Sequence, residues 1–236
     1  MSLSPNSILK GLIDRPVTID DWQRSDKYFE GFLIPKDEVL ELATKNAEEN
    51  GLPAIAVGPA EGKLLHLVAR TMGAKRILEV GTLGGFSAIW FGRAVPEDGE
   101  VLTHEINPKH AEVARKNLEV AGLSKKVTVV VGPAIDSLKK LRDEPKFDLA
   151  FIDADKDSNV AYVTEAKRLV RSGGVIIVDN VVRFGLVADP STTSPPIEGV
   201  RAMLKALQTD TDLECTVIGT ATGRGGYDGF MYALRK

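Results

Sequence analysis

Five strand-like runs alternate with four helical patterns in the middle of the chain, and this alternation restricts the fold more than any other feature. The runs are rich in Val, Ile and Leu, which is typical of parallel strands covered by helices on both faces of a sheet. The predicted strands are 76–80, 100–104, 126–131, 147–152 and 174–178, and the predicted helices are 85–94, 107–121, 134–142 and 158–171.

The flanking segments complete the prediction of a doubly wound α/β fold. Helical patterns cover 36–50, 63–72 and 197–208, whereas 1–35 shows no regular pattern. The runs LECTVIG and FMYALRK are separated by the glycine-rich TATGRGGYDG, which predicts an antiparallel hairpin at one end of the sheet. No change in composition marks a boundary, so residues 1–236 are expected to form a single domain with 1–35 as an N-terminal segment.

Charge and hydropathy exclude several classes of protein. The net charge is −3 and no basic block stands out, which disfavours a nucleic-acid partner. Apolar runs stay far below the ~20 residues that span a bilayer, and the N-terminus lacks the apolar region of a signal peptide. Cys215 is the only cysteine, so no intrachain disulfide can form. We therefore expect a cytoplasmic protein in which Cys215 is a buried small residue.

The segment after the first predicted strand has the character of a cofactor loop. It reads Glu79-Val80-Gly81-Thr82-Leu83-Gly84-Gly85 and leads into a helix. Its glycines do not match the Gly-x-Gly-x-x-Gly spacing of a nicotinamide site, and Glu79 would repel a pyrophosphate but suit the amino group of a methionine. Glu105, after the second strand, can accept hydrogen bonds from a ribose. S-adenosylmethionine is favoured over a dinucleotide, with a plain tight turn as the structural alternative.

Acidic residues follow the fourth and fifth strands. Asp153 ends one run, and Asp179 with Asn180 ends the next, so parallel strands bring them to the same edge. Two carboxylates and an amide oxygen suit Mg²⁺ or Ca²⁺ better than zinc. Lys156 could take a proton from a substrate held there. A solvated loop is the alternative; Asp157 is expected to cap a helix, and the role of Asp155 stays open.

These stretches together resemble the cation-dependent class I S-adenosylmethionine O-methyltransferases, the family of the catechol and caffeoyl-coenzyme A O-methyltransferases. The resemblance rests on ILEVGTLGGFSAIWFG, VLTHEINPKHAEVARKNLEVAGL, FDLAFIDADKDSNVAYV, GGVIIVDNVV and YDGFMYALRK. It implies a seven-stranded sheet with an antiparallel last strand and a homodimer. Where the family often has Thr-Gly-Tyr-Ser, this chain has Gly84-Gly85-Phe86-Ser87, and Ala56-Val57-Gly58 also departs from plant relatives.

The resemblance implies roles residue by residue. Lys156 matches the catalytic base. Asp153, Asp179 and Asn180 match the ligands of a divalent cation, with Mg²⁺ expected and Ca²⁺ or Mn²⁺ as alternatives. The cofactor contacts it implies are Val57, Glu79, Gly81, Thr82, Ser87, Glu105, Ala134 and Asp153.

The predicted function is methyl transfer from S-adenosylmethionine to a small phenolic acceptor with vicinal hydroxyls. The alternatives are an NAD-dependent oxidoreductase, a non-catalytic cofactor-binding member of the family, and a methyltransferase acting on protein or nucleic acid. No membrane partner is expected. The aromatic residues Trp22, Tyr28, Phe29 and Phe32 could form a substrate lid, a dimer contact or ordinary core, and Phe184, Leu186 and 188–196 could form a second wall of the acceptor site. His66, His104 and His110 are expected to be structural or exposed.

Overall fold

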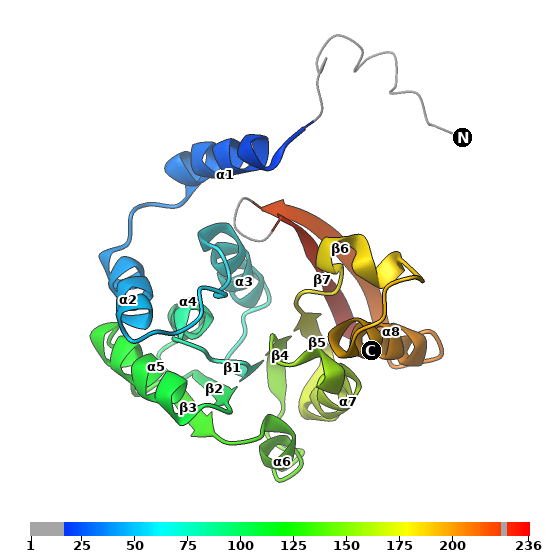
Figure 1. The fold of residues 1–236 in the computed structure, drawn as a ribbon. Coiled ribbons are helices and arrows are strands. Elements are labelled where there is room, and N and C mark those ends of the chain that lie inside the picture. The colour runs from blue at the N-terminus through cyan, green and yellow to red at the C-terminus, as the bar shows by residue number, and fades with distance from the viewer. Residues whose placement is uncertain (1–16, 223–225) are drawn as a thin grey trace.

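A seven-stranded sheet in the order β3-β2-β1-β4-β5-β7-β6 organises the chain (Figure 1). The structure is a computed structural model, and it describes residues 17–222 and 226–236. Strands β1 to β5 pair in parallel, whereas β7 is antiparallel to both β5 and β6. The strands are β1 (Arg76–Val80), β2 (Glu100–Glu105), β3 (Val127–Val131), β4 (Phe147–Ile152), β5 (Val170–Val178), β6 (Leu213–Thr222) and β7 (Gly226–Arg235). The predicted sheet, its last antiparallel strand and the hairpin are confirmed.

Helices cover both faces of the sheet and create two hydrophobic layers. Ile77 packs into the layer formed with α2 to α5, and its neighbour Leu78 packs into the layer formed with α6 to α8, because successive strand residues point to opposite faces. The helices are α1 (Ile19–Leu33), α2 (Glu38–Glu49), α3 (Pro59–Thr71), α4 (Phe86–Ala94), α5 (Pro108–Val120), α6 (Ala134–Leu138), α7 (Asn159–Leu169) and α8 (Pro195–Leu207), with short 3₁₀ segments η1 (Lys156–Ser158) and η2 (Arg183–Ala188).

The starts of the helices follow from local sequence. The Asp37 side chain accepts hydrogen bonds from Val39 N and Leu40 N at the start of α2. Helix α3 begins at Pro59, four residues before the predicted start, because proline suits the first helical position and Glu61 Oε2 accepts the N–H of Gly58 at 2.8 Å. This earlier start moves Glu61 from a predicted loop onto the first turn of a helix.

The prediction that 1–35 is irregular is wrong over Ile19–Leu33, which form α1. This helix buries none of its side chains, and Tyr28, Phe29 and Phe32 are 60–74% exposed. The core-packing interpretation of these three aromatic residues is therefore wrong. In the fold, α1 contacts α3 and β6 (Figure 1). Residues 1–16 of the predicted N-terminal segment, and 223–225 of the predicted turn, lie outside the described residues.

Three smaller predictions also need correction. Cys215 is exposed rather than buried, because β6 is the edge strand and pairs only with β7. Helix α6 ends at Leu138 rather than at 142, since Lys140 N and Leu141 N bond three residues back instead of four. Strand β5 begins at Val170, which pairs with Phe147 ahead of an irregularity in the register. Within residues 17–222 and 226–236, no helix is long and apolar enough to cross a membrane.

Candidate active site

The carboxyl ends of β1 and β4 approach each other closely and bring two predicted site segments together. Asp153 N donates to Val80 O at 2.7 Å. Gly81 has φ +104°, and a Cβ at this position would lie 2.0 Å from Asp153 O. No other residue fits this contact, so Gly81 places the glycine loop against the start of the acidic segment.

Glu105 shapes the glycine loop from the neighbouring strand. Its Oε2 accepts Leu83 N at 2.7 Å, and its Oε1 accepts Asn107 N at 2.9 Å. Leu83 has φ +47°, an uncommon conformation for a branched residue. The carboxylate holds the loop and keeps lone pairs for a further hydrogen bond, as a ribose contact requires.

Glu79 is the most unusual carboxyl group in this region. It is fully buried, and neither carboxyl oxygen has a hydrogen-bond partner among the described residues. Burial raises its pKa to about 7, although the nearby hydroxyls of Ser87 and Thr103 partly oppose this shift. A buried carboxyl group without partners is costly unless a ligand supplies donors, so the site fits a cationic group such as an ammonium.

The remaining predicted cofactor residues lie around the same loop. The Thr82 hydroxyl is 2.6 Å from that of Thr103, so this side chain is already satisfied inside the protein. Ser87 lies in the first turn of α4, and Ala134 begins α6; both are buried. Val57, also buried, comes just before α3. Thr82 and Ser87 therefore belong to the glycine loop and the helix that follows it, whereas Val57 and Ala134 lie at the starts of α3 and α6.

Lys156 and Asp153 form an ion pair at the end of β4. The distance from Lys156 Nζ to Asp153 Oδ1 is 2.8 Å, and Lys156 is only 6% exposed. Helix α8 fixes the backbone here, since a Cβ at Gly199 would lie 2.2 Å from Lys156 O. A buried ammonium held next to a carboxylate is thus positioned by packing from two elements.

Asp179 lies among other carboxyl groups at the end of β5. Burial, and then the charges of Asp153 and Glu61, raise its pKa to about 8, while Lys156 partly opposes the shift. Its Oδ1 accepts Asn180 N at 2.7 Å, and Asn180 adopts the left-handed conformation with φ +56°. Within 17–222 and 226–236, no three His, Cys, Asp or Glu side chains are arranged to hold a metal. Any cation site here therefore depends on an amide as well as carboxylates.

Comparisons with known proteins place this arrangement in a family. The family model described as O-methyltransferase matches residues 34–226. The chain belongs to the O-methyltransferase family. It is 46% identical over 209 residues to a catechol O-methyltransferase of Mycobacterium tuberculosis, covering 89% of this chain and 94% of that protein. The crystal structure of a Bacillus cereus O-methyltransferase in complex with SAH matches with a TM-score of 0.90 at 42% identity, covering 93% of this chain and 100% of that one. The crystal structure of the O-methyltransferase TomG of Streptomyces achromogenes, in complex with SAM, matches with a TM-score of 0.89 at 42% identity, covering 94% of this chain and 100% of that one.

Membership in the O-methyltransferase family confirms the predicted family and enzyme class. It also disfavours the NAD-dependent alternative, in line with the spacing of the glycines. The sheet order found here is that of the Rossmann-like methyltransferases among its structural neighbours. The remaining site features can therefore be considered as parts of an O-methyltransferase.

Two acidic residues of this O-methyltransferase were missed in the sequence. Glu61 lies in the first turn of α3, where burial, and then the charges of Asp153 and Asp228, raise its pKa. Asp228 Oδ1 accepts Val182 N and Arg183 N at 3.1 and 2.8 Å, so it fixes the start of η2. The Pro-x-Glu pattern at 59–61 is typical of a helix start and could have shown Glu61 to be ordered.

The loop after Asn180 is fastened at both ends. Asp228 holds its beginning, and the guanidinium of Arg201 in α8 donates to the carbonyls of Leu186, Val187, Asp189 and Thr192. Phe184, with φ +60°, stays 63% exposed, and Leu186 is 39% exposed. The ring of Phe184 lies close to Gly226, where an added Cβ would come within 3.0 Å of it. The second wall of the acceptor site stays a prediction.

The other acidic and imidazole side chains have structural surroundings. Asp155 accepts Tyr162 Oη at 2.6 Å, and despite burial the hydroxyls of Ser158 and Tyr162 lower its pKa. Asp157 lies inside η1 and does not cap a helix, so that prediction is wrong; Ser158 precedes α7. The Nδ1 atoms of His66 and His104 contact the carbonyls of Trp90 and Glu79, and His110 lies beside Glu105, as expected for structural residues.

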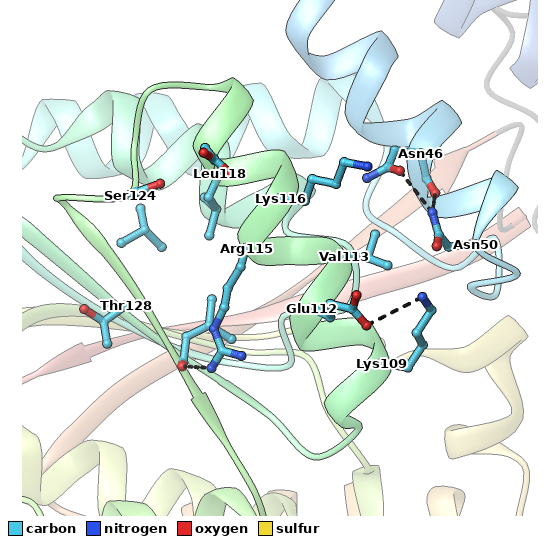
Figure 2. Close-up of a pocket in the computed structure, with 13 residues that line it drawn as sticks. Asn46, Asn50, Lys109, Glu112, Val113, Arg115, Lys116, Leu118, Ser124 and Thr128 are labelled. Atoms are coloured by element: carbon cyan, nitrogen blue, oxygen red, sulfur yellow. Dashed lines mark hydrogen bonds and ion pairs between the residues drawn. The ribbon is translucent and has the colours of Figure 1, made fainter.

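Two hollows of different character flank these elements. A pocket of about 290 Å³ lies between α3 and the sheet, and its lining is mostly carbon but includes Asp179 and Glu61. A larger groove of about 710 Å³ runs along α5 beside α2 and β3, where ions such as Lys109 and Glu112 pair with each other (Figure 2). None of the predicted site residues lines the larger groove. The smaller pocket is therefore the one connected to the candidate active site.

Proposed function

We propose that this protein transfers a methyl group from S-adenosylmethionine to one of two vicinal hydroxyls of a small phenolic acceptor, with the help of a divalent cation. The observation that carries the proposal is the concentration of half-buried carboxyl groups around Lys156: Asp153 in contact with it, and Asp179 with a pKa raised to about 8. Carboxylates that repel each other in this way call for a cation. The names of two relatives, both catechol O-methyltransferases, support the same acceptor class.

The glycine-loop residues are the proposed S-adenosylmethionine site. The carboxyl group of Glu79, which has no partner, would receive the ammonium of the methionine moiety, and Glu105 would accept hydrogen bonds from the ribose. Gly81, which has no Cβ, lets the loop lie directly against the backbone of Asp153. Val57, Thr82, Ser87, Ala134 and Asp153 complete the proposed contacts. When bound, the cofactor supplies a methyl group on a sulfonium.

The proposed cation ligands are Asp153, Asp179 and Asn180. The donor set fits a hard divalent cation such as Mg²⁺, with Ca²⁺ or Mn²⁺ as alternatives, because all three side chains offer oxygen atoms. The raised pKa of Asp179 supports the same conclusion, since two carboxylates that lack a counter-charge repel each other. When bound, a cation would supply positive charge that favours loss of a phenolic proton.

Lys156 is the proposed general base. Asp153 holds its Nζ at 2.8 Å, and the packing of α8 against η1 fixes its backbone. Once neutral, Nζ would accept the proton of the attacking hydroxyl, and general-base catalysis of this kind is worth about 10²–10⁴-fold. Positioning of two reactants in one site would contribute about 7–11 kcal/mol more.

The decisive experiment measures methyl transfer from S-adenosylmethionine to catechol with Mg²⁺, and again after treatment with EDTA. We expect turnover with Mg²⁺, loss of turnover with EDTA, and recovery when Mg²⁺ is restored. Turnover that persists in EDTA would support the methyltransferase activity but contradict the requirement for a divalent cation. Binding of S-adenosylmethionine without turnover of any catechol would instead favour a non-catalytic member of the family.

The exposed aromatic residues of α1 are proposed to form a lid over the acceptor or a contact between two copies of the chain in a homodimer. Tyr28 lies 5.4 Å from Phe29 and 5.0 Å from Phe32 between ring centroids, and all three are exposed. Sedimentation velocity of the wild type and of Phe32→Ser tests the contact. A dimer that Phe32→Ser weakens would support it, whereas a monomeric wild type would leave only the lid.

A further inference from the structure

We propose that the 290 Å³ pocket between α3 and the sheet receives the ring substituent of the methyl acceptor and selects uncharged, apolar substituents against carboxylates. The inference rests on the proposed function, because it assigns a specificity to the acceptor side of the same site. It goes beyond that function by stating which acceptors the enzyme prefers.

The pocket is continuous with the proposed active site. Asp179, a proposed cation ligand, and Val57, a proposed cofactor contact, both line it. Asp179 lies one residue beyond the end of β5 and two residues after Ile177, and both residues line the pocket next to α3. A phenol bound at Asp179 would therefore direct one of its ring edges toward this pocket.

The walls of the pocket consist almost entirely of carbon. Phe151 and Ile177 form its floor on the sheet and are each 2% exposed, and Leu65 of α3 is 5% exposed. Leu64 and Ile218, at 41% and 46% exposure, lie where the pocket meets solvent. Its volume of about 290 Å³ is near the lower limit for small-molecule sites, which run from about 300 to 1,000 Å³. An alkyl-substituted ring suits this space, and a bulky conjugate does not.

The charged side chains that line the pocket disfavour anionic substituents on the acceptor. The only ionisable carboxyl groups in the lining are Glu61 and Asp179, and no Lys, Arg or His is among the described residues that line it. With Asp179 assigned to the cation, a carboxylate on the acceptor would enter apolar surroundings beside Glu61, and the lining offers no cationic side chain to pair with it. An ammonium would meet attraction from Glu61 but would lose its hydration against the carbon walls. A neutral alkyl group meets neither cost.

The test compares kcat/KM across catechols that differ only para to one hydroxyl: hydrogen, methyl, ethyl, propyl, carboxylate and aminoethyl. Burial of each methylene is expected to raise kcat/KM by about fourfold through the alkyl series. The kcat/KM of the carboxylate compound is expected to be at least tenfold lower than that of catechol itself. The kcat/KM of the aminoethyl compound is expected to lie between those of the carboxylate and ethyl compounds. A flat alkyl series, or a carboxylate as good as propyl, would overturn the inference while leaving the methyltransferase activity in place.

Two matched variants locate the effect in the pocket. Ile218 lines it and Val217, its neighbour on edge strand β6, does not, although their exposures are similar at 46% and 40%. Ile218→Lys is expected to raise kcat/KM for the carboxylate and lower it for propyl, each by about tenfold. Val217→Lys should leave the ranking unchanged. Equal responses of the two variants would place the selectivity elsewhere and overturn the inference.

A binding measurement keeps the inference testable if no acceptor is methylated, an outcome that would count against the proposed function. Calorimetric titration of the same compounds into protein with S-adenosylhomocysteine and Mg²⁺ should give the same ranking. Equal affinities for the propyl and carboxylate compounds, or no binding of either, would overturn it.

Discussion

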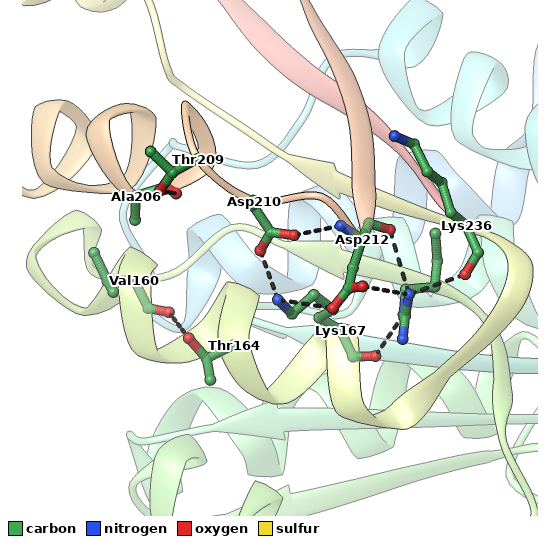
Figure 3. Close-up of polar contacts among 9 residues, drawn as sticks. Val160, Thr164, Lys167, Ala206, Thr209, Asp210, Asp212 and Lys236 are labelled. Atoms are coloured by element: carbon green, nitrogen blue, oxygen red, sulfur yellow. Dashed lines mark hydrogen bonds and ion pairs between the residues drawn. The ribbon is translucent and has the colours of Figure 1, made fainter.

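Two clusters of acids and bases in this protein differ in how completely their charges are neutralised. In the active-site cluster, Lys156 faces Asp153 while Asp179 is left with a pKa raised to about 8. In the C-terminal cluster, Lys167 of α7 binds Asp210 at 2.6 Å and Asp212 at 3.4 Å, and Arg235 of β7 also pairs with Asp212 (Figure 3).

The pKa values of the aspartates in the two clusters shift in opposite directions. Hydrogen bonding to Asp210 raises the pKa of Lys167. Burial would raise the pKa of Asp210, but its hydrogen bonds, including the one from Lys167, lower that pKa below its ordinary value. Both shifts stabilise the charged forms, so this cluster is complete within the chain. The raised pKa of Asp179 shows the reverse, a carboxylate that the protein alone does not stabilise. Incomplete neutralisation therefore distinguishes a site that awaits a ligand from one that holds the fold together.

The largest effect is expected from removing Lys156, the proposed general base of the active-site cluster. Lys156→Met should lower turnover by about 10²–10⁴-fold, because the proton acceptor is lost. Affinity for S-adenosylmethionine, measured by calorimetry, should stay within about twofold. An equal loss of turnover and cofactor affinity would contradict the role of Lys156.

Asp179→Asn should remove activity with Mg²⁺ and yet stabilise the protein in EDTA. Because the folded pKa of about 8 exceeds the ordinary 3.8, the wild type loses stability as pH rises between these values. The free energy of unfolding of the variant should rise by about 1–3 kcal/mol at pH 8, because one pKa unit corresponds to about 1.4 kcal/mol and solvent around the half-buried side chain screens part of the shift. Urea unfolding near pH 8 and near pH 4 checks this; a gain that persists near pH 4 would show another cause.

Glu79, in the proposed cofactor site, is a second carboxyl group whose charge the protein alone does not neutralise. Its pKa of about 7 means that the carboxyl group is largely protonated below neutral pH, when it cannot pair with an ammonium. Affinity for S-adenosylmethionine should therefore fall about fivefold from pH 7 to about pH 6, because the ionised fraction falls from about one half to about one tenth. In Glu79→Gln the affinity should be low at both pH values. A wild-type affinity that does not change over this range would separate Glu79 from the cofactor.

The smallest effect is expected from the C-terminal cluster. Lys167→Met should cost about 1 kcal/mol of stability, since Lys167 is 27% exposed and such pairs contribute little. Turnover should be unchanged. The lowered pKa of Asp210 means that the contribution is present above the ordinary value of 3.8 and is lost as pH falls below it. Loss of turnover in this variant would erase the distinction between the two clusters.

The sequence predicted the frame of the site because strands and their ends are local features. Each run of Val, Ile and Leu became a strand within a few residues of its predicted bounds. The acidic residues Glu79, Glu105, Asp153 and Asp179 each lie within one residue of the end of such a strand. Since parallel strands finish at one edge, their proximity followed from the order of the elements. Local signals were less useful in α1, which contacts α3 and β6 but buries none of its side chains.

Glu61, Asp228 and the exposure of Cys215 could not be predicted, because each depends on residues distant in sequence. Glu61 meets Asp153 and Asp228 only after α3 packs on the sheet, and Asp228 reaches Val182 only through the pairing of β5 with β7. Cys215 is exposed because β6 happens to be the edge.

The sequence by itself determined the alternating elements, the edge at which the polar residues gather and the family to which the chain belongs. Only the tertiary structure decided which carboxyl groups lack partners and where an apolar pocket meets them. The reason is physical: strand and helix propensities act over neighbouring residues, whereas burial, charge neutralisation and the space left between α3 and the sheet depend on every element that packs there.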